Sequence, residues 1–156
     1  MDALTPDIRR IEATDARVAP LIAAHLDLMR ASSPACSVHA MEASDLLEAG
    51  ADFFAAFEGE DAVAMGAIKL VEPGHAELKS MHVLQAKRGA GLADAILRHC
   101  MDAAKARGAT RLSLETGSRP AFAPAVAFYR RHGFEFCPPF FGYEEDPESV
   151  FLSRNI

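Results

Sequence analysis

The sequence predicts an α/β (α+β) fold: a mixed, twisted sheet of about six to seven strands flanked by four helices. A strand-like run, Glu77–Leu84, leads into a long amphipathic helix, and a second strand run, residues 111–116, follows it. A strand, a helix and a strand in this order form a parallel unit with a right-handed crossover. Two further strand runs, residues 52–58 and 62–71, are separated by Gly59-Glu60-Asp61, which is a hairpin turn signal.

Local signals predict the elements that surround this centre. Thr14 or Asp15 is a suitable cap for a helix that reaches about Arg30, with Pro20 in its first turn. The long central helix ends at Gly108, which supplies a left-handed stop. The other expected elements are strands over residues 7–13, 134–137 and 150–155, loops over 31–41 and 117–123, a short helix from Ser44 or Asp45 to Ala49, and a helix that begins at Pro124 and contains Tyr129.

Composition narrows the possible classes of protein. A chain of 156 residues of which 50% are hydrophobic is expected to form a single domain, 1–156, with a sizeable core. The net charge of −6 and the lack of a basic stripe argue against nucleic acid or an anionic membrane as partners. Three scattered cysteines, charged residues near the N-terminus and no apolar run of roughly 20 residues favour a reduced, cytoplasmic protein outside the membrane.

A glycine-containing turn, Arg88–Ala93, lies between the central strand and the long helix. Small residues there leave space in front of a helix N-terminus, where unpaired backbone N–H groups can hold a diphosphate. The alternative is a turn that only packs tightly. A Rossmann turn would require glycine where Asp94 stands, and a P-loop requires Gly-Lys-Ser/Thr, which is absent.

Two segments resemble the GNAT superfamily of acyl-CoA-dependent N-acyltransferases. They are Met81-x-Val83-x4-Arg88-Gly89-x-Gly91-x-Ala93-x2-Ile96-Leu97 and, downstream, Ala125-Val126-Ala127-Phe128-Tyr129-Arg130-Arg131-His132-Gly133-Phe134. The resemblance implies the GNAT fold over nearly the whole chain. The stretch at Lys79-Ser80-Met81 and the chain ending further resemble a branch of small bacterial YsnE-like and PaiA-like acetyltransferases.

The resemblance also implies a donor and a division of roles. The donor would be acetyl-CoA, with no metal. Backbone N–H groups of the central strand would polarise the thioester oxygen and Tyr129 would be the general acid. The residues implied in cofactor binding are Met81, His82, Val83, Arg88, Gly89, Ala90, Gly91, Leu92, Ala93 and Tyr129. Amide formation needs such groups because the carbonyl gains negative charge and the departing thiolate needs a proton.

Glu77 is the candidate base, because it lies four residues before Met81, where some members of the superfamily carry a glutamate base. Strand alternation would place Glu77, Lys79, Met81 and Val83 on one side, unless a bulge intervenes. The alternative is a structural charge pair between Glu77 and Lys79. Glu115, at the end of the next strand, is a weaker candidate for the same role.

The acceptor is the least specified part of the expected function. Phe140, Phe141 and Tyr143 follow two prolines and are expected to line an acceptor pocket or a subunit contact, as in a homodimer. The acidic run Glu144, Glu145, Asp146 and Glu148 stands beside them, and His39 lies in the loop that forms an acceptor wall in the resembled family. An acidic rim would favour a small primary amine as acceptor. The alternative, and the more usual reason for such a run, is a solvated acidic loop.

Other classes of protein fit less well. Six histidines show no paired metal-ligand spacing, and no G-x-S-x-G nucleophile elbow occurs. Two positions depart from the resembled pattern, because Phe122 replaces a frequent asparagine and Gln85 a frequent proline. The remaining alternative to an enzyme is an acyl-CoA-binding sensor or interaction module without turnover.

Overall fold

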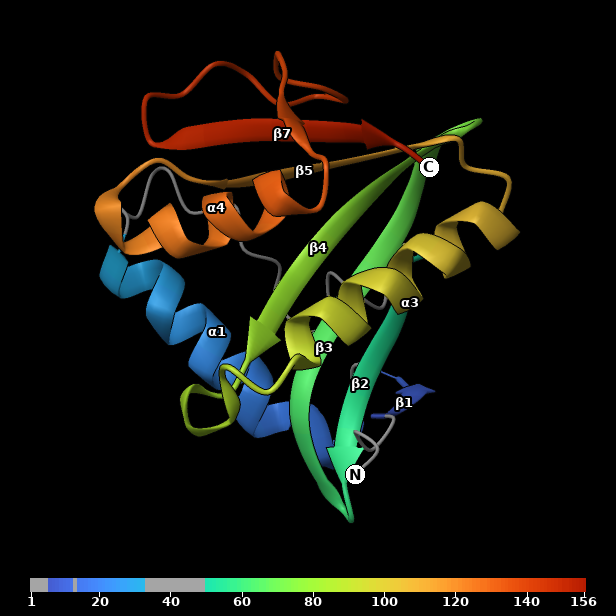
Figure 1. Cartoon of the computed structure of the whole chain (residues 1–156), viewed down its shortest axis with the longest axis vertical. Helices are drawn as coiled ribbons and strands as arrows, with labels where there is room; N and C mark the ends of the chain where they lie inside the picture. Colours follow the sequence, from blue (N-terminus) through green and yellow to red (C-terminus); the bar gives the residue numbers. More distant parts are fainter. Residues whose placement is uncertain (1–5, 13, 33–49) are drawn as a thin grey trace.

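A computed structural model describes residues 6–12, 14–32 and 50–156, and its seven strands form one sheet (Figure 1). The strand order is β1-β2-β3-β4-β5-β7-β6. The strands are β1 (Asp7–Arg10), β2 (Asp52–Glu58), β3 (Asp61–Glu72), β4 (His75–Val83), β5 (Arg111–Gly117), β6 (Glu135–Phe136) and β7 (Ser149–Asn155). The α-helices are α1 (Ala19–Ser32), α3 (Leu92–Ala106) and α4 (Ala123–Arg131), and short 3-10 turns are η1 (Ala16–Val18), η3 (Gln85–Lys87) and η4 (Pro120–Phe122).

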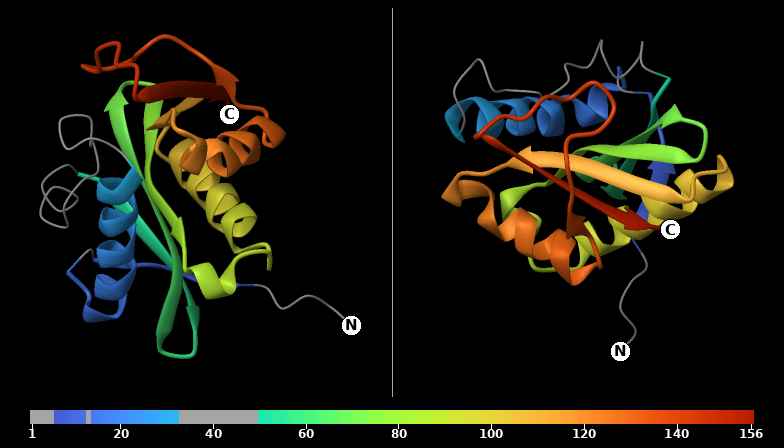
Figure 2. Two further views of the ribbon diagram at one scale, coloured as in Figure 1. Left: turned by 90° about the vertical axis from the view of Figure 1, so that its left-hand side faces the viewer. Right: turned by 90° about the horizontal axis from the view of Figure 1, so that it is seen from above.

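The helices cover the two faces of the sheet, as Figure 2 shows in its left view. Helix α1 packs on one face against a cluster that includes Phe53, Met65 and Ala67. Helices α3 and α4 lie on the other face, where the larger hydrophobic cluster forms. Of the helices in the described ranges, none is long and apolar enough to cross a membrane.

Helix α3 approaches the sheet closely because β3 carries a glycine beneath it. A Cβ atom on Gly66 would lie 2.7 Å from Ile96 Cγ2 and 2.9 Å from Met81 Sδ. Both distances are shorter than real Cβ contacts allow, so any larger residue would push the helix away. Gly66 therefore fixes the distance between α3 and the central strands.

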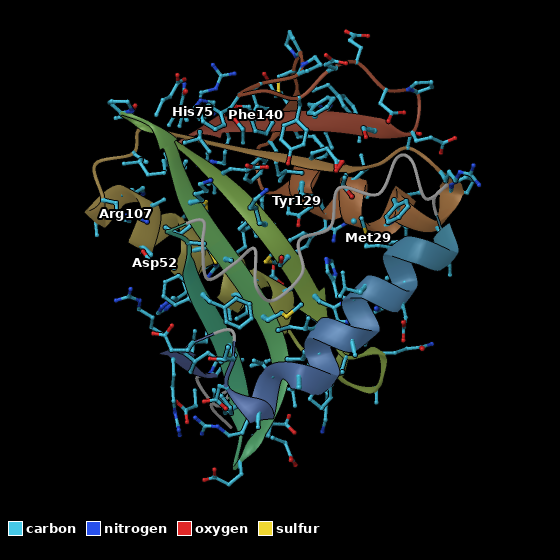
Figure 3. All side chains as sticks on the ribbon, turned by 180° about the vertical axis from the view of Figure 1, so that it is seen from behind. Met29, Asp52, His75, Arg107, Tyr129 and Phe140 are labelled. Atoms are coloured by element: carbon cyan, nitrogen blue, oxygen red, sulfur yellow. The ribbon has the colours of Figure 1, made fainter. Side chains whose placement is uncertain are left out.

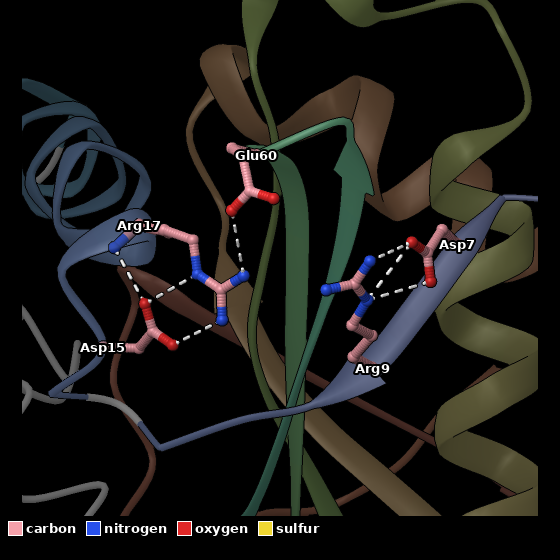
Figure 4. Close-up of polar contacts among 5 residues, drawn as sticks. All are labelled: Asp7, Arg9, Asp15, Arg17 and Glu60. Atoms are coloured by element: carbon pink, nitrogen blue, oxygen red, sulfur yellow. Dashed lines mark hydrogen bonds and ion pairs between the residues drawn. The ribbon is translucent and has the colours of Figure 1, made fainter.

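The start of α1 is organised by a small polar cluster (Figure 4). Asp15 accepts a 2.9 Å hydrogen bond from the backbone N–H of Arg17 and so caps η1. The Arg17 guanidinium pairs with Asp15 at 2.8 Å and with Glu60, in the β2–β3 turn, at 3.6 Å. This confirms the expected cap and the helix start near Ala19, with Pro20 in the first turn.

Strand β4 contains a bulge at Ser80, whose φ of 57° is in the left-handed region. Lys79 pairs with Ala67 and His82 with Met65, so β4 has one residue more than β3 between these pairs. The bulge reverses the alternation beyond it. Consequently Met81 faces α3, whereas His82 faces α1.

Strands β4 and β5 are the only parallel pair within the described sheet, and they pair over a short length. The register joins His75 to Arg111, Ala76 to Leu112 and Glu77 to Ser113, and then ends. Beyond Glu77 the two strands diverge towards their C-terminal ends, which leaves the wedge visible in Figure 1. We call this opening the β4–β5 wedge.

Several boundaries differ from the sequence prediction. The strand expected over residues 7–13 ends at Arg10, although Ile11 N still donates to Phe53 O at 2.9 Å. The strand expected over residues 134–137 is limited to Glu135 and Phe136, because Phe134 is buried and donates to Tyr129 O in the turn that ends α4. Three α-helices are described rather than the expected four, and the helix predicted at residues 44–49 lies outside the described residues.

Candidate active site

The β4–β5 wedge opens into a cavity of about 500 Å³. Its walls come from β4, β5, α4, the C-terminal half of α1, the turn before α3 and Tyr143. In Figure 3, Tyr129 lies near the centre of this region, and Met29 marks the end of α1 that borders it. A cavity of this size at a sheet opening is a suitable place for a ligand of moderate size.

The glycine turn forms one mouth of the cavity. Gly89 and Gly91 have φ values of 85° and 83°, which β-carbon-bearing residues rarely adopt, and no atom lies within 4 Å of a Cβ built on either. Gly91 is the N-cap of α3, and its carbonyl accepts the Ala95 N–H at 3.1 Å. The earlier amides of the first turn therefore have no helical acceptor and point outward, an arrangement that suits an anion.

Arg88 contributes to this turn through the backbone. Its Nε donates to Val83 O at 3.2 Å and so joins the end of β4 to the start of the turn. The carbonyl and the N–H of one strand residue point to the same side of the strand. Leu84 N donates to Val63 O of β3, so the Val83 N–H points away from β3, into the β4–β5 wedge.

Tyr129 reaches the cavity from α4. Its side chain is 7% exposed, packs against Phe128 and Phe134, and lines the cavity. Within the described part of the chain, its hydroxyl makes no hydrogen bond, so it is available to a ligand. Burial raises the pKa of the phenol, which keeps it protonated through the neutral range.

Glu77 is buried on β4 and has two polar neighbours. The hydroxyl of Tyr143 donates to Glu77 Oε2 at 2.6 Å, and Lys79 Nζ lies 3.3 Å from the same oxygen. Burial first, and the Glu77 charge second, raise the pKa of Tyr143, so this phenol remains a donor. The expected pair of Glu77 and Lys79 is present, and Glu77 also lines the cavity.

The bulge that the sequence prediction left open does interrupt the alternation along β4. Glu77 and Lys79 share the α1 face with His82, because the bulge at Ser80 moves Met81 and Val83 to the α3 face. Met81 and Val83 still line the cavity through the strand that carries them. Glu115, the weaker candidate base, lines the cavity from β5.

Sequence reasoning missed the role of His25 as a neighbour of His82. The two Nδ1 atoms lie 3.3 Å apart, and both rings line the cavity. Burial lowers the pKa of His25 to about 4, with the nearby His82 as a second cause. The spacing of Leu21, His25 and Leu28 on one side of a helix was the signal that could have indicated it.

The aromatic and acidic C-terminal segment contributes less than expected. Phe140 packs on His75, Tyr143 and Phe151, Phe141 is exposed, and only Tyr143 reaches the main cavity. The carboxylates of the acidic run are not among its lining groups, and Glu145 and Asp146 border a separate depression of about 220 Å³. His39 lies outside the described residues.

No group of three or more histidine, cysteine, aspartate or glutamate side chains is arranged to hold a metal ion in the ranges that the structure describes. The polar groups that line the cavity include two phenols, two carboxylates, a pair of imidazoles and three cationic side chains, and the N-terminus of α3 lies at its mouth.

A comparison with family models gives the class of protein that this fold and site define. Residues 18–134 match the model of the Acetyltransferase (GNAT) family. The chain belongs to this family and is therefore an acyltransferase enzyme.

Curated relatives agree with this assignment. The chain is 38% identical over 143 residues to the Uncharacterized N-acetyltransferase YsnE of Bacillus subtilis (strain 168), a match that covers 92% of this chain and 95% of the relative. It is 39% identical over 149 residues to the Uncharacterized N-acetyltransferase YedL of Escherichia coli (strain K12), covering 96% and 94%. It is also 34% identical over 124 residues to the IAA acetyltransferase of Azospirillum brasilense, covering 79% and 80%.

Solved structures share the fold. A protein from Klebsiella pneumoniae subsp. pneumoniae MGH 78578, provisionally assigned as an acyl-CoA N-acyltransferase, superposes with a TM-score of 0.79 at 30% identity over 99% of both chains. The PaiA N-acetyltransferase of Thermoplasma acidophilum, solved in complex with coenzyme A, has a TM-score of 0.76 over 98% of this chain and 100% of its own at 13% identity. At that identity the second likeness shows the fold alone.

Proposed function

We propose that this protein transfers the acetyl group of acetyl-CoA to the primary amine of a small acceptor molecule, by direct attack within a ternary complex. One observation supports the proposal: a single cavity joins the N-terminus of α3 to a buried carboxylate and to a phenol that has no hydrogen-bond partner among the described residues. Tyr129 enters from the α4 side of the sheet and Glu77 from the α1 side. A donor and an acceptor can therefore approach each other from opposite sides of the β4–β5 wedge.

The residues present fit a coenzyme A thioester. The open space at Gly89 and Gly91 suits a diphosphate that approaches the backbone closely, and the amides of the first turn of α3 would bind it. The wedge gives an elongated arm a path along β4 to Tyr129. Acetyl-CoA supplies the activated carbonyl, and every other contribution is made by the chain.

Each residue has a chemical task in this proposal. The Val83 N–H, directed into the wedge, would donate to the carbonyl oxygen as it gains negative charge. Tyr129 would protonate the departing sulfur. Its raised pKa is matched by the dry surroundings, which would raise the pKa of the leaving thiol as well.

Glu77 would hold the acceptor ammonium and take its first proton, directly or through water, which leaves the free amine that attacks. Its Oε2 is occupied by Tyr143 and Lys79, whereas Oε1 has no hydrogen-bond partner within residues 6–12, 14–32 and 50–156. The carboxylate is thus positioned by one oxygen and free to accept with the other.

The test is release of free CoA from acetyl-CoA with a panel of spermidine, phenylalaninamide, IAA and buffer alone. IAA is included because one relative is named for it. CoA release that depends on an amine supports the proposal, and Glu77→Gln should lower the rate most at acidic pH, where the amine is most protonated. Binding of acetyl-CoA without release for any acceptor would instead identify an acyl-CoA sensor without turnover.

A further inference from the structure

The mechanism above leaves two buried histidines in the cavity without a task. His25 comes from α1 and His82 from β4, fifty-seven residues apart in the chain. Their rings meet edge to face, with centroids 5.3 Å apart and planes at 78°. Both line the cavity rather than only the core.

The contact between the two Nδ1 atoms determines how the rings share protons. At 3.3 Å one Nδ1 carries the proton and the other accepts it. The donating ring then has an unprotonated Nε2, and the accepting ring has an Nε2–H. Neither Nε2 has a hydrogen-bond partner within the described part of the chain, so the pair offers the cavity one proton acceptor and one donor.

His82 stands at the place where the reaction is proposed to occur. It lies between Met81 and Val83, and its side chain faces α1, on the side that Glu77 and Lys79 share. Glu77 lies four residues before Met81, roughly 13 Å along an extended strand. A side chain at position 82 is therefore closer to the Val83 amide than the Glu77 carboxylate is.

The surroundings keep both imidazoles neutral at physiological pH. Burial lowers the pKa of His25 to about 4, and burial together with the Arg88 charge lowers that of His82. The other charged or titratable groups that line the same cavity are Arg88 from the turn before α3, Glu77 and Lys79 from β4, Glu115 from β5, Tyr129 and Arg131 from α4, and Tyr143. An imidazole in this cavity is unprotonated at neutral pH and can accept a proton. The imidazolium that forms then readily gives the proton up again.

We propose that His82 accepts the second proton, which the attacking amine loses as the C–N bond forms, and that His25 is a positioning residue that holds His82 in the tautomer with Nε2 free. This inference rests on the proposed function. As the new C–N bond forms and the thioester C–S bond breaks, the amine proton moves to Nε2 of His82, and Tyr129 gives its proton to the sulfur. The imidazolium of His82 then loses its proton to water in the cavity.

The decisive variant is His82→Asn, because an asparagine amide reaches the position of Nδ1 but not that of Nε2. It retains a partner for His25 and removes the proton acceptor. With the amine of the panel that wild type acetylates best, turnover should fall roughly 10²-fold, while the Kd for acetyl-CoA stays unchanged. The wild-type rate should fall at acidic pH as the His82 imidazole, whose pKa is lowered, becomes protonated, and the residual rate of the variant should lack that fall.

Two further variants separate chemistry from structure. His82→Ala leaves space for a small base, so added imidazole should restore turnover in proportion to its concentration. His25→Leu removes the Nδ1 partner, and His25→Asn keeps one, so the second should retain more turnover than the first. His99→Asn is the matched control, because His99 is a partly buried histidine that contacts Phe54 outside the cavity, and its rate should equal that of wild type.

The tautomer can be observed without turnover. Imidazole ¹⁵N shifts of wild type should show Nδ1 of His82 protonated and Nε2 unprotonated at pH 7. The opposite tautomer, a wild-type rate in His82→Asn, or no restoration by imidazole would overturn the inference while leaving amine-dependent CoA release intact. The proposed function itself would fail only if wild type released no CoA with any member of the panel, and the inference about His82 would then fail with it.

Discussion

The hydroxyl of Tyr143 donates a 2.6 Å hydrogen bond to Oε2 of Glu77, which connects the loop after β6 to the central strand. Hydrogen bonds to a charged partner typically contribute about 1.5–3 kcal/mol. Tyr143→Phe removes the bond without changing the ring that packs on Phe140 and Phe151. We expect the free energy of unfolding to fall by about that amount in urea titrations, and the KM for the amine to rise. Equal stability and KM in the variant would show that the bond positions nothing.

Tyr129→Phe also removes a hydroxyl from the cavity, but unlike the Tyr143 hydroxyl this one is not hydrogen-bonded to a described residue. The phenol makes no hydrogen bond within the described residues, so its loss should cost little stability. If it protonates the sulfur, kcat should fall roughly 10²-fold or more with an unchanged Kd for acetyl-CoA. Steady-state kinetics measures kcat, and calorimetry measures the Kd for acetyl-CoA independently. Wild-type kcat would leave the positioning of donor and acceptor as the main catalytic contribution.

Gly91→Val tests the site for the diphosphate. The φ of 83° makes this substitution strained, at a cost of about 1–2 kcal/mol, so a loss of affinity alone would be ambiguous. Gly108→Val is the matched control, because Gly108 has a φ of 88° and open space but lies at the other end of α3. Both variants should lose similar stability, and only Gly91→Val should lose acetyl-CoA affinity, by tenfold or more in calorimetry. Equal affinities would place the diphosphate elsewhere.

Burial of His25 makes stability depend on pH. Its pKa is about 4 in the folded protein and near 6.5 when unfolded, so the unfolded chain binds more protons between these values. The stability is complete above pH 6.5 and is lost as the pH falls towards 4, by about 3 kcal/mol in total. Urea titrations at pH 7 and pH 5 should show a smaller loss for His25→Asn than for wild type. Parallel losses in the two proteins would contradict the neutral, buried state.

The acidic run is expected to matter little for catalysis. Because these carboxylates do not line the main cavity, the combined change Glu144→Gln, Glu145→Gln and Asp146→Asn should leave the KM for spermidine unchanged at low and high salt. A rise in KM that disappears at high salt would restore the electrostatic argument for a cationic acceptor.

Local patterns predicted most of the fold. Pro20, Gly108 and Pro124 marked helix ends, and the positions of β4 and α3 were predicted to within two residues. Turn and cap chemistry acts over a few residues, so it is readable in a sequence. The strand predicted over residues 134–137 is only two residues long in the structure, because Phe134 has strand character but is held by the turn that ends α4.

The site was predictable where it depended on short motifs. Tyr129 and Glu77 border one cavity together with three residues of the predicted turn, Arg88, Gly89 and Ala93. The bulge at Ser80 was the element that local reasoning could not determine, since it arises from pairing with β3 and has no signal in the residues themselves. The partnership of His25 with His82 depends on that bulge, and so it was missed.

Strands β4 and β5 are paired only at one end, and from there they diverge. Three residue pairs form the joint, and Val83 and Thr116 lie near the two tips. A small rotation of β5 relative to β4 about this joint could leave the three pairs intact. It would move the C-terminal ends of the two strands several times further than the paired residues. At the joint, His75 Nε2 and Ser113 Oγ lie 2.7 Å apart, and Ser113 Oγ is 2.9 Å from Ser153 Oγ, so three strands are fastened there by side chains. A small polar network at the opposite end of the strands therefore holds the joint from which the β4–β5 wedge opens, although its members His75, Ser113 and Ser153 do not line the cavity.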